Sequence, residues 1–235
     1  MKLGIMVGMA DELESEFKKL TEMGFNTCQL VSWDPDIFTD ENAARVKSLM
    51  EAYAVEVSAF WCGWGGPCEW NLIQGPVTIG LVPPAYRMER LNTLKRCSDF
   101  IRKTGITDIV THVGFIPVNP ADQEYAGLVG ALRDLARHLK RNGQYFLFET
   151  GQEVPSVLLR TIEDIDEDNV GVNLDPANLL MYGMGNPLDA LDVFGKYVRN
   201  VHGKDGAYPA SGRYLGDEKP MGEGRVNYPA FIRKL

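Results

Sequence analysis

The sequence is short of the features that mark membrane, secreted and disulfide-rich proteins. Its apolar runs stay well below the roughly 18 residues of a membrane-spanning helix. The apolar start, residues 3–10, leads directly into Asp11 and Glu12 without a signal-peptide cleavage region. Its 4 cysteines form neither a CxxC pair nor a dense pattern, which favours free thiols in a reducing compartment. We therefore expect a cytoplasmic protein without a membrane partner.

Positive charge is also scarce. The chain has 24 Lys and Arg against 32 Asp and Glu, a net charge of -8 and a pI near 5.0, so nothing attracts it generally to phosphate backbones. We therefore expect no nucleic-acid partner. A hydrophobic content of 45% is ordinary and supplies a substantial core. The length of 235 residues fits a single domain over residues 1–235.

Short apolar runs alternate with helical patterns through the whole chain. We expect strands at 3–9, 25–33, 54–61, 107–115, 145–149, 170–175 and 198–202, and helices at 11–23, 39–53, 88–101, 122–141, 155–165, 187–197 and 227–235. Residues 61–84, rich in Gly, Pro and Trp, form a long loop of the kind that is usually functional. The alternation predicts an α/β fold, a parallel sheet closed as a (β/α)8 TIM barrel, with an open doubly wound sheet as the alternative.

A closed eight-stranded barrel needs one more strand than these residues supply. The pattern ends within a helix at 227–235. We therefore expect the eighth strand to lie beyond Leu235, so that the barrel is C-terminally incomplete in this sequence.

Three metal-competent side chains come at the ends of predicted strands. Glu149 and Asp175 are 26 positions apart, and Asp175 and His202 are 27 apart, each about one strand-helix unit. In a TIM barrel such positions converge on the face that carries active sites. Each residue alone has a structural explanation as a rim salt bridge, a turn cap or a satisfied histidine. The coincidence of all three favours a divalent ion, Mn²⁺, Mg²⁺, Co²⁺ or Zn²⁺.

Aromatic residues gather near the same predicted strand ends. Ring faces can pack on the C–H faces of a sugar, and an indole N–H can donate to a hydroxyl group. Core packing explains some of them equally well, and we select Trp61 and Trp64 as substrate-binding candidates. The whole set is Trp33, Trp61, Trp64, Trp70 and Phe115.

The remaining candidate catalytic and substrate-binding residues are one further histidine and three basic residues. His112 ends the fourth predicted strand, where a structural and a catalytic role are equally plausible. Lys204, Arg213 and Arg225 lie in the polar segment after His202, and one of them can hold a substrate phosphate or carboxylate. Solvated loop charge is the competing interpretation for each.

Four motifs resemble the sugar phosphate isomerase/epimerase family, the xylose isomerase-like TIM barrels. They are Phe148-Glu-Thr-Gly-Gln152, Asn173-Leu-Asp-Pro-Ala-Asn178, Val201-His-Gly-Lys-Asp205 and the segment from Gly222 to Phe231. The resemblance spans essentially the whole chain, and the motifs together are specific to the superfamily without fixing the substrate.

The resemblance implies roles for particular residues. It makes Glu149, Asp175 and His202 ligands of a divalent ion, and it places a fourth ligand, a Glu, on the eighth strand beyond Leu235. It puts His112 in the pocket. Several relatives have a second His where this chain has Asn178, which we expect to bind substrate together with Gln152.

The function that we expect is a metal-dependent isomerase or epimerase of a sugar, keto-sugar or related polyol. Glu149, or the Glu expected on the eighth strand, would move a proton through a metal-stabilised enediolate, with His112 assisting at a hydroxyl group. A lyase, such as a dehydratase of a keto-inositol, is the alternative.

Two more distant functions stay open from the sequence. One is an endonuclease for abasic DNA on a related barrel, which the net charge of -8 and only 3 His disfavour. The other is a sugar-binding barrel without turnover. The sequence also leaves open whether the protein forms a homo-oligomer.

Overall fold

Seven parallel strands form one sheet in the computed structural model, which describes residues 1–10 and 12–235. They are β1 (Ile5–Gly8), β2 (Thr27–Ser32), β3 (Glu56–Cys62), β4 (Asp108–Thr111), β5 (Tyr145–Glu149), β6 (Val170–Leu174) and β7 (Val198–Val201). Each strand pairs with the next one along the chain, in the order β1 to β7. A doubly wound sheet reverses its strand order, so the sequential order rejects that alternative. The expected TIM-barrel architecture is confirmed, with seven strands.

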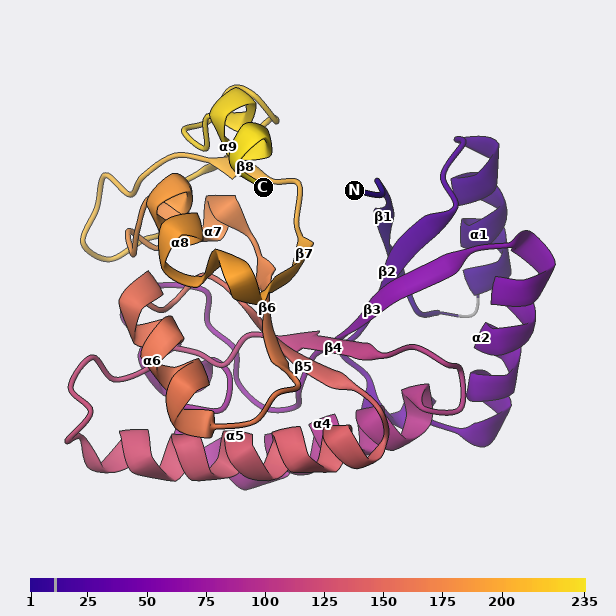
Figure 1. Cartoon of the computed structure of the whole chain (residues 1–235), viewed down its shortest axis with the longest axis horizontal. Coiled ribbons are helices and arrows are strands. Elements are labelled where there is room, and N and C mark those ends of the chain that lie inside the picture. Colours follow the sequence, from indigo (N-terminus) through magenta and orange to yellow (C-terminus); the bar gives the residue numbers. More distant parts are fainter. Residues whose placement is uncertain (11) are drawn as a thin grey trace.

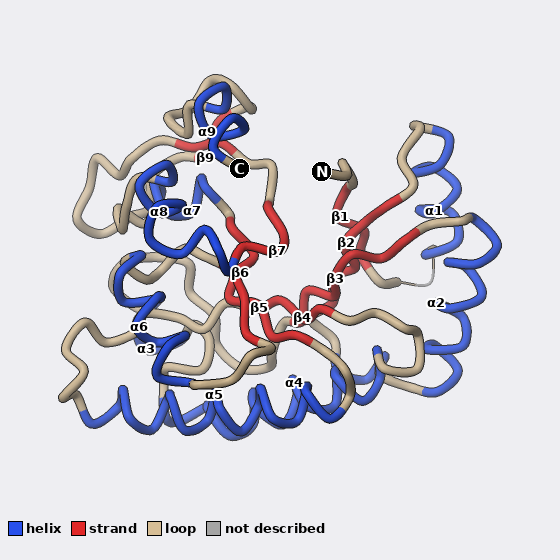
Figure 2. The backbone as a smooth tube through the Cα atoms, in the orientation of Figure 1, coloured by secondary structure: helices blue, strands red, loops and turns tan. Residues whose placement is uncertain are grey.

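Helices cover the outer face of this curved sheet, as Figures 1 and 2 show. The longest are two neighbours, α4 and α5, whose apolar faces pack together beneath the strands. The helices are α1 (Leu13–Glu22), α2 (Asp40–Tyr53), α3 (Gly75–Thr78), α4 (Pro84–Ile101), α5 (Gln123–Arg141), α6 (Pro155–Ile165), α7 (Pro176–Met181), α8 (Pro187–Phe194) and α9 (Tyr228–Lys234), with 3-10 turns η1 (Pro35–Ile37) and η2 (Gly195–Tyr197).

The core has two parts, one on each face of the sheet. The larger part lies between strands and helices and contains, for example, Leu30, Phe146 and Leu132. The smaller part faces the barrel interior, with Trp61, Val110 and Leu147 from three neighbouring strands. Successive side chains of a strand point to opposite faces, so strands packed on both sides read as continuous apolar runs.

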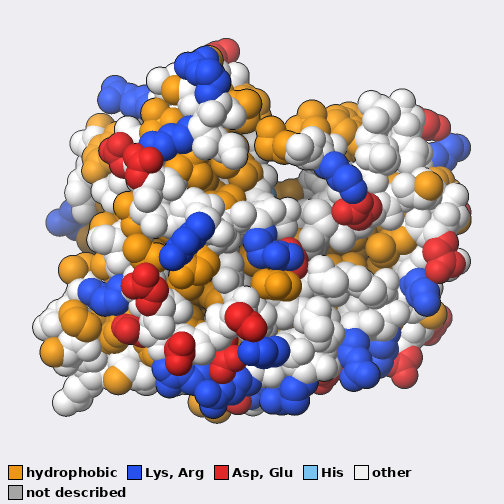
Figure 3. Space-filling model, in the orientation of Figure 1, with side chains coloured by type: hydrophobic (Ala, Val, Ile, Leu, Met, Phe, Trp, Pro, Cys, Tyr) orange, Lys and Arg blue, Asp and Glu red, His pale blue; other side chains and the backbone are white. Residues whose placement is uncertain are grey.

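One side of the barrel is open, because β1 and β7 do not pair with each other or with any further strand of the described residues. A cleft of about 1640 Å³ lies between them, lined by residues such as Ile5, Thr27, Val198 and Asn200. Figure 3 shows this opening, with hydrophobic side chains on both sides. The cleft reaches Glu149, Asp175 and His202 at its inner end.

The main departures from the expected elements lie after strands. The strand expected at 107–115 ends at Thr111, and the chain then turns at Gly114, whose φ of +102° favours glycine. Helix α7 directly after β6, and the short pair β8 (Asp205–Gly206) and β9 (Glu218–Lys219), were not expected. Asp11, the expected start of the first helix, lies outside the described residues. No helix in the described part of the chain has the length and apolarity to span a membrane.

Candidate metal and sugar site

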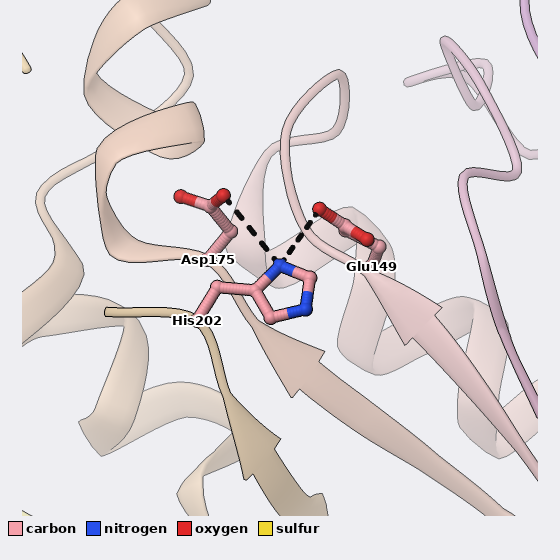
Figure 4. A group of neighbouring side chains, drawn as sticks. All are labelled: Glu149, Asp175 and His202. Carbon is pink, nitrogen blue, oxygen red and sulfur yellow. Dashed lines mark hydrogen bonds and ion pairs between the residues drawn. The ribbon is translucent and has the colours of Figure 1, made fainter. Parts of the chain in front are cut away.

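The three predicted ligands lie together at the carboxyl ends of adjacent strands (Figure 4). Glu149 is the last residue of β5, Asp175 follows β6, and His202 follows β7. Because these strands are neighbours in a parallel sheet, their ends bring the side chains to one place. Glu149 and Asp175 are buried, and His202 is half-buried.

One distance between these side chains matches that of two donors on a shared cation, and the others are wider. His202 Nδ1 lies 3.1 Å from Glu149 Oε1 and 3.8 Å from Asp175 Oδ2, and the three ligand atoms lie within 4.8 Å of one another. Two donors that are each about 2.1 Å from an ion, at the usual angles, lie roughly 3.0–3.4 Å apart. A mixed set of carboxylate oxygen and imidazole nitrogen suits the divalent ions expected from the sequence.

Asp175 divides its carboxylate between two roles. Oδ1 accepts a hydrogen bond of 2.8 Å from the backbone N–H of Asn178 and so caps α7, which Pro176 begins. Oδ2 is the oxygen that faces His202 and Lys204, at 3.8 Å from each. The cap therefore fixes the orientation in which the second oxygen reaches the site.

Buried opposite charges control the protonation of this cluster. Burial alone would raise the pKa of Glu149, but His112, His202 and the Trp61 N–H lower it well below its usual range. Burial would lower the pKa of His202, but the two carboxylates outweigh it and raise that pKa. Glu149 is thus an anion that draws positive charge toward it.

Gln29, in the middle of β2, fixes the orientation of the His202 ring. Its Oε1 lies 2.7 Å from His202 Nε2, and its Nε2 donates to Asn173 Oδ1 at 3.4 Å. When His202 donates its Nε2–H to Gln29 Oε1, the neutral ring that a metal ion requires presents its Nδ1 lone pair to the two carboxylates. Such a second hydrogen bond commonly orients a metal-bound histidine. Sequence reasoning missed Gln29, whose only signal was an amide within an apolar strand.

His112 follows β4 and lies beside the cluster. Its Nε2 is 3.6 Å from Glu149 Oε1, and its ring meets the rings of Trp61 and Trp70 edge-on. Burial lowers the pKa of His112 and outweighs the opposing effect of Glu149, so the ring is neutral near pH 7. A neutral imidazole in this place can exchange a proton with a ligand hydroxyl group.

The four tryptophans form an aromatic wall, consisting of Trp33, Trp61, Trp64 and Trp70, opposite the charged cluster. Ring centroids of Trp33 lie 5.0 Å from Trp61, 5.2 Å from Trp64 and 6.3 Å from Trp70. Trp61 joins the wall to the cluster, because its Nε1–H donates to Glu149 Oε2. Phe115 packs against the buried cluster that contains Trp61 and Trp64, and its ring lies edge-on to Tyr182.

The remaining sequence candidates divide into near and distant residues. Lys204 Nζ donates to Asn178 Oδ1 at 2.8 Å, and Asn178 Nδ2 lies 3.5 Å from Glu149 Oε1, so both residues border the cluster. Arg213 and Arg225 are exposed, and Arg213 lines a small separate hollow beside Gln74. The structure therefore does not bring these two arginines to the charged cluster.

Several side chains around the site bury polar atoms that make no hydrogen bond within the described protein. Each such atom normally costs about 1–3 kcal/mol, so a group of them suggests a polar ligand. They include Trp64 Nε1 and His112 Nδ1. The buried Gln152 amide and Tyr182 hydroxyl group interact with each other, and backbone N–H groups face the Glu153 carboxyl group. Burial raises the pKa of Glu153 to about 8, against the opposing effect of nearby backbone N–H groups.

The family model described as xylose isomerase-like TIM barrel matches residues 17–235 of this chain. A xylose isomerase domain protein from Planctomyces limnophilus is 30% identical, with a TM-score of 0.92 over 100% of this chain and 86% of that chain. An uncharacterized protein from Methanocaldococcus jannaschii is 22% identical over 100% of this chain and 79% of its own length.

More distant solved structures share the fold at TM-scores of 0.73, 0.71 and 0.67. They are a D-tagatose 3-epimerase-like protein, 18% identical over 99% of this chain and 86% of that one, and a probable 3-DHS dehydratase from Bacillus anthracis, 17% identical over 99% and 88%. The third is a xylose isomerase-like TIM barrel protein from Mycobacterium smegmatis in complex with magnesium, 19% identical over 94% and 76%.

Proposed function

We propose, since the chain belongs to the xylose isomerase-like TIM-barrel family, that the protein is a metal-dependent isomerase or epimerase of a keto-sugar or related polyol. The observation that carries this proposal is the placement of Glu149, Asp175 and His202 at three adjacent strand ends, with ligand atoms within 4.8 Å. The D-tagatose 3-epimerase-like protein and the magnesium complex of the same fold support it.

The ion would be held by Glu149 Oε1, Asp175 Oδ2 and His202 Nδ1. When bound, it would polarise a carbonyl and a neighbouring hydroxyl oxygen of the substrate and so acidify the adjacent C–H bond. Both carboxylates favour a hard ion, and the imidazole is compatible with Mn²⁺, Mg²⁺, Co²⁺ or Zn²⁺.

The chain's own groups would then move the proton. Glu149 is an anion beside the ligand positions, and the Trp61 N–H holds its Oε2, so the carboxylate is oriented to accept a proton from carbon. His112, neutral and 3.6 Å from Glu149 Oε1, would transfer a proton at a hydroxyl oxygen. The aromatic wall would pack on the sugar C–H face and restrict water.

The test uses the purified protein with Mn²⁺ or Mg²⁺ and a panel of ketoses, inositols and their phosphates in D₂O. We expect about one divalent ion per chain and NMR-detected deuterium incorporation at carbon with formation of an isomer. Water loss without an isomer would instead indicate the dehydratase alternative, which shares the proton-abstraction step. A chain that binds no divalent ion and exchanges no carbon-bound proton would contradict the proposal and favour a non-catalytic sugar-binding barrel.

A further inference from the structure

The segment that carries half of the aromatic wall has little regular structure of its own. Residues 63–83 include only the four-residue helix α3, yet they bring Trp64 and Trp70 to the site. The far end of the segment docks on the turn that follows His112, where Gly80, at φ +71°, lies against the backbone of Val113. A segment of this kind needs an anchor to hold its side chains in fixed positions.

Arg90, on α4, supplies such an anchor. Its guanidinium donates to four backbone carbonyl groups of the segment: Nε to Gly65 at 3.3 Å, Nη2 to Pro67 at 2.9 Å, and Nη1 to Thr78 and Gly80 at 2.7 Å each. These carbonyl groups come from both ends of the segment. One planar, rigid group therefore joins the two ends.

Carbonyl dipoles and aromatic rings, not a carboxylate, stabilise the buried charge of Arg90. The side chain is 1% exposed, and no ion pair joins it to a carboxylate of the described residues. Besides the four carbonyl dipoles, the ring of Trp64 lies 5.2 Å and the ring of Tyr86 4.7 Å from the guanidinium carbon. A buried cation is costly, so these contacts must offset its desolvation. The contacts of the Arg90 guanidinium are therefore mainly with the backbone of the segment and with the Trp64 ring.

Trp64 connects this anchor to the site. Its ring contacts Trp33 and Trp61 in the aromatic wall, with centroids 5.2 and 6.2 Å away. Its indole N–H is buried without a hydrogen-bond partner in the described protein. An orphaned donor beside an apolar wall suits an acceptor oxygen of a bound sugar.

We propose that Arg90 is a positioning residue for substrate binding. It touches no substrate but fixes the 65–80 backbone and the Trp64 ring, so that the Trp64 N–H is already oriented toward a sugar hydroxyl oxygen. The part of this proposal that concerns the sugar rests on the proposed function, whereas the anchoring of the segment does not.

The test compares R90K with a matched control, R87K. Arg87 is also a buried arginine of α4, but it donates only to the carbonyl groups of Leu81 and Val82 at the far end of the segment, beyond the measured amides. It pairs with Glu124 and is not among the contacts of Trp64. We expect hydrogen exchange of the amides of 64–80 to accelerate at least roughly tenfold in R90K, because each tenfold change needs only about 1.4 kcal/mol. In R87K these amides should keep their protection within about threefold.

The functional measurement uses D-tagatose as the probe with the Mn²⁺-loaded protein. We expect R90K to raise KM roughly tenfold while kcat stays within about threefold and Mn²⁺ affinity is unchanged, because only oriented binding is lost. W64F keeps an aromatic, though smaller, side chain and removes the N–H. It should reproduce the rise in KM with normal hydrogen exchange, and it tests the proposal even if R90K does not fold.

Unchanged protection of 64–80 in R90K, or equal loss in R87K, would overturn the anchoring role. A normal KM in W64F, or in an R90K protein whose segment has loosened, would overturn the link to substrate. If the wild type itself neither binds nor converts a ketose, the proposed function fails, and hydrogen exchange still decides whether Arg90 anchors the segment.

Discussion

The charged half and the aromatic half of the candidate site are built in different ways. Glu149, Asp175 and His202 sit at or directly after the ends of three paired strands, so the hydrogen bonds of the sheet position them. Trp64 and Trp70 instead come from a segment that Arg90 holds through side-chain contacts. The difference predicts that the two halves of the site affect different steps. Changes in the charged half should affect metal binding and turnover, and changes in the aromatic half should affect substrate affinity.

The largest effect should come from removing a ligand in the charged half. We expect E149Q and H202A each to lose roughly 10²–10⁴-fold or more of kcat/KM, because the proton acceptor or the ion's orientation is lost. Steady-state kinetics and Mn²⁺ titration measure both losses. E218Q removes an exposed carboxylate 3.5 Å from Lys204 and serves as a control within about threefold of wild type. Full activity of E149Q after metal removal would reject the role of the charged half.

A smaller effect should follow from releasing the His202 ring. We expect Q29L to weaken Mn²⁺ binding about 10–100-fold, because the ring loses the hydrogen bond that selects its tautomer. Titration of Mn²⁺ followed by EPR gives the affinity directly. Ser58, a half-buried polar residue on β3 that donates to Cys28 O, offers the control S58A. Equal Mn²⁺ affinity in Q29L and S58A would show that Gln29 only packs.

Trp61 belongs to both halves of the site, so a change at Trp61 should affect turnover although its ring lies in the aromatic wall. W61F keeps a smaller aromatic ring in the aromatic wall but removes the donor to Glu149 Oε2. A hydrogen bond to a charged group contributes about 1.5–3 kcal/mol, so we expect kcat to fall roughly tenfold or more with little change in KM. W70F, which changes the wall and its edge-on contact with His112 but no hydrogen bond to Glu149, should alter KM and leave kcat within about threefold. If both variants behaved alike, the two halves would not be separable.

A separate effect, on stability and not on activity, concerns the buried acid Glu153 near the charged half. Its pKa is raised to about 8, so between roughly pH 4.5 and 8 the folded protein holds a proton that the unfolded chain has lost. Stability must therefore fall as pH rises through this window, by at most about 1.4 kcal/mol per pH unit. We expect E153Q to lack this contribution, so that urea midpoints of the two proteins diverge toward pH 8. Parallel pH profiles would mean that Glu153 ionises normally.

The charged half was largely predictable from the sequence, because strand ends in a regular βα alternation must converge. The proximity of Glu149, Asp175 and His202 follows from chain order alone. Gln29 was not predictable, since its partner is 173 positions away and an amide within a strand does not reveal which side chain it meets. The same holds for Arg90, whose role depends on carbonyl groups of an irregular segment. Arg213 and Arg225 were candidates by charge only, and the structure leaves them at the surface.

The hydrogen bond between His202 and Gln29 has a mechanical consequence. The sheet from β1 to β7 is an open strip, since β1 and β7 pair neither with each other nor with a further strand among the described residues. The contact of 2.7 Å between the side chains after β7 and on β2 joins the last strand of that strip to its second strand and so bridges the open side. Widening the cleft then requires breaking this contact or bending the whole ladder. An occupied metal site would hold the His202 ring in place and so make the open side of the barrel more rigid.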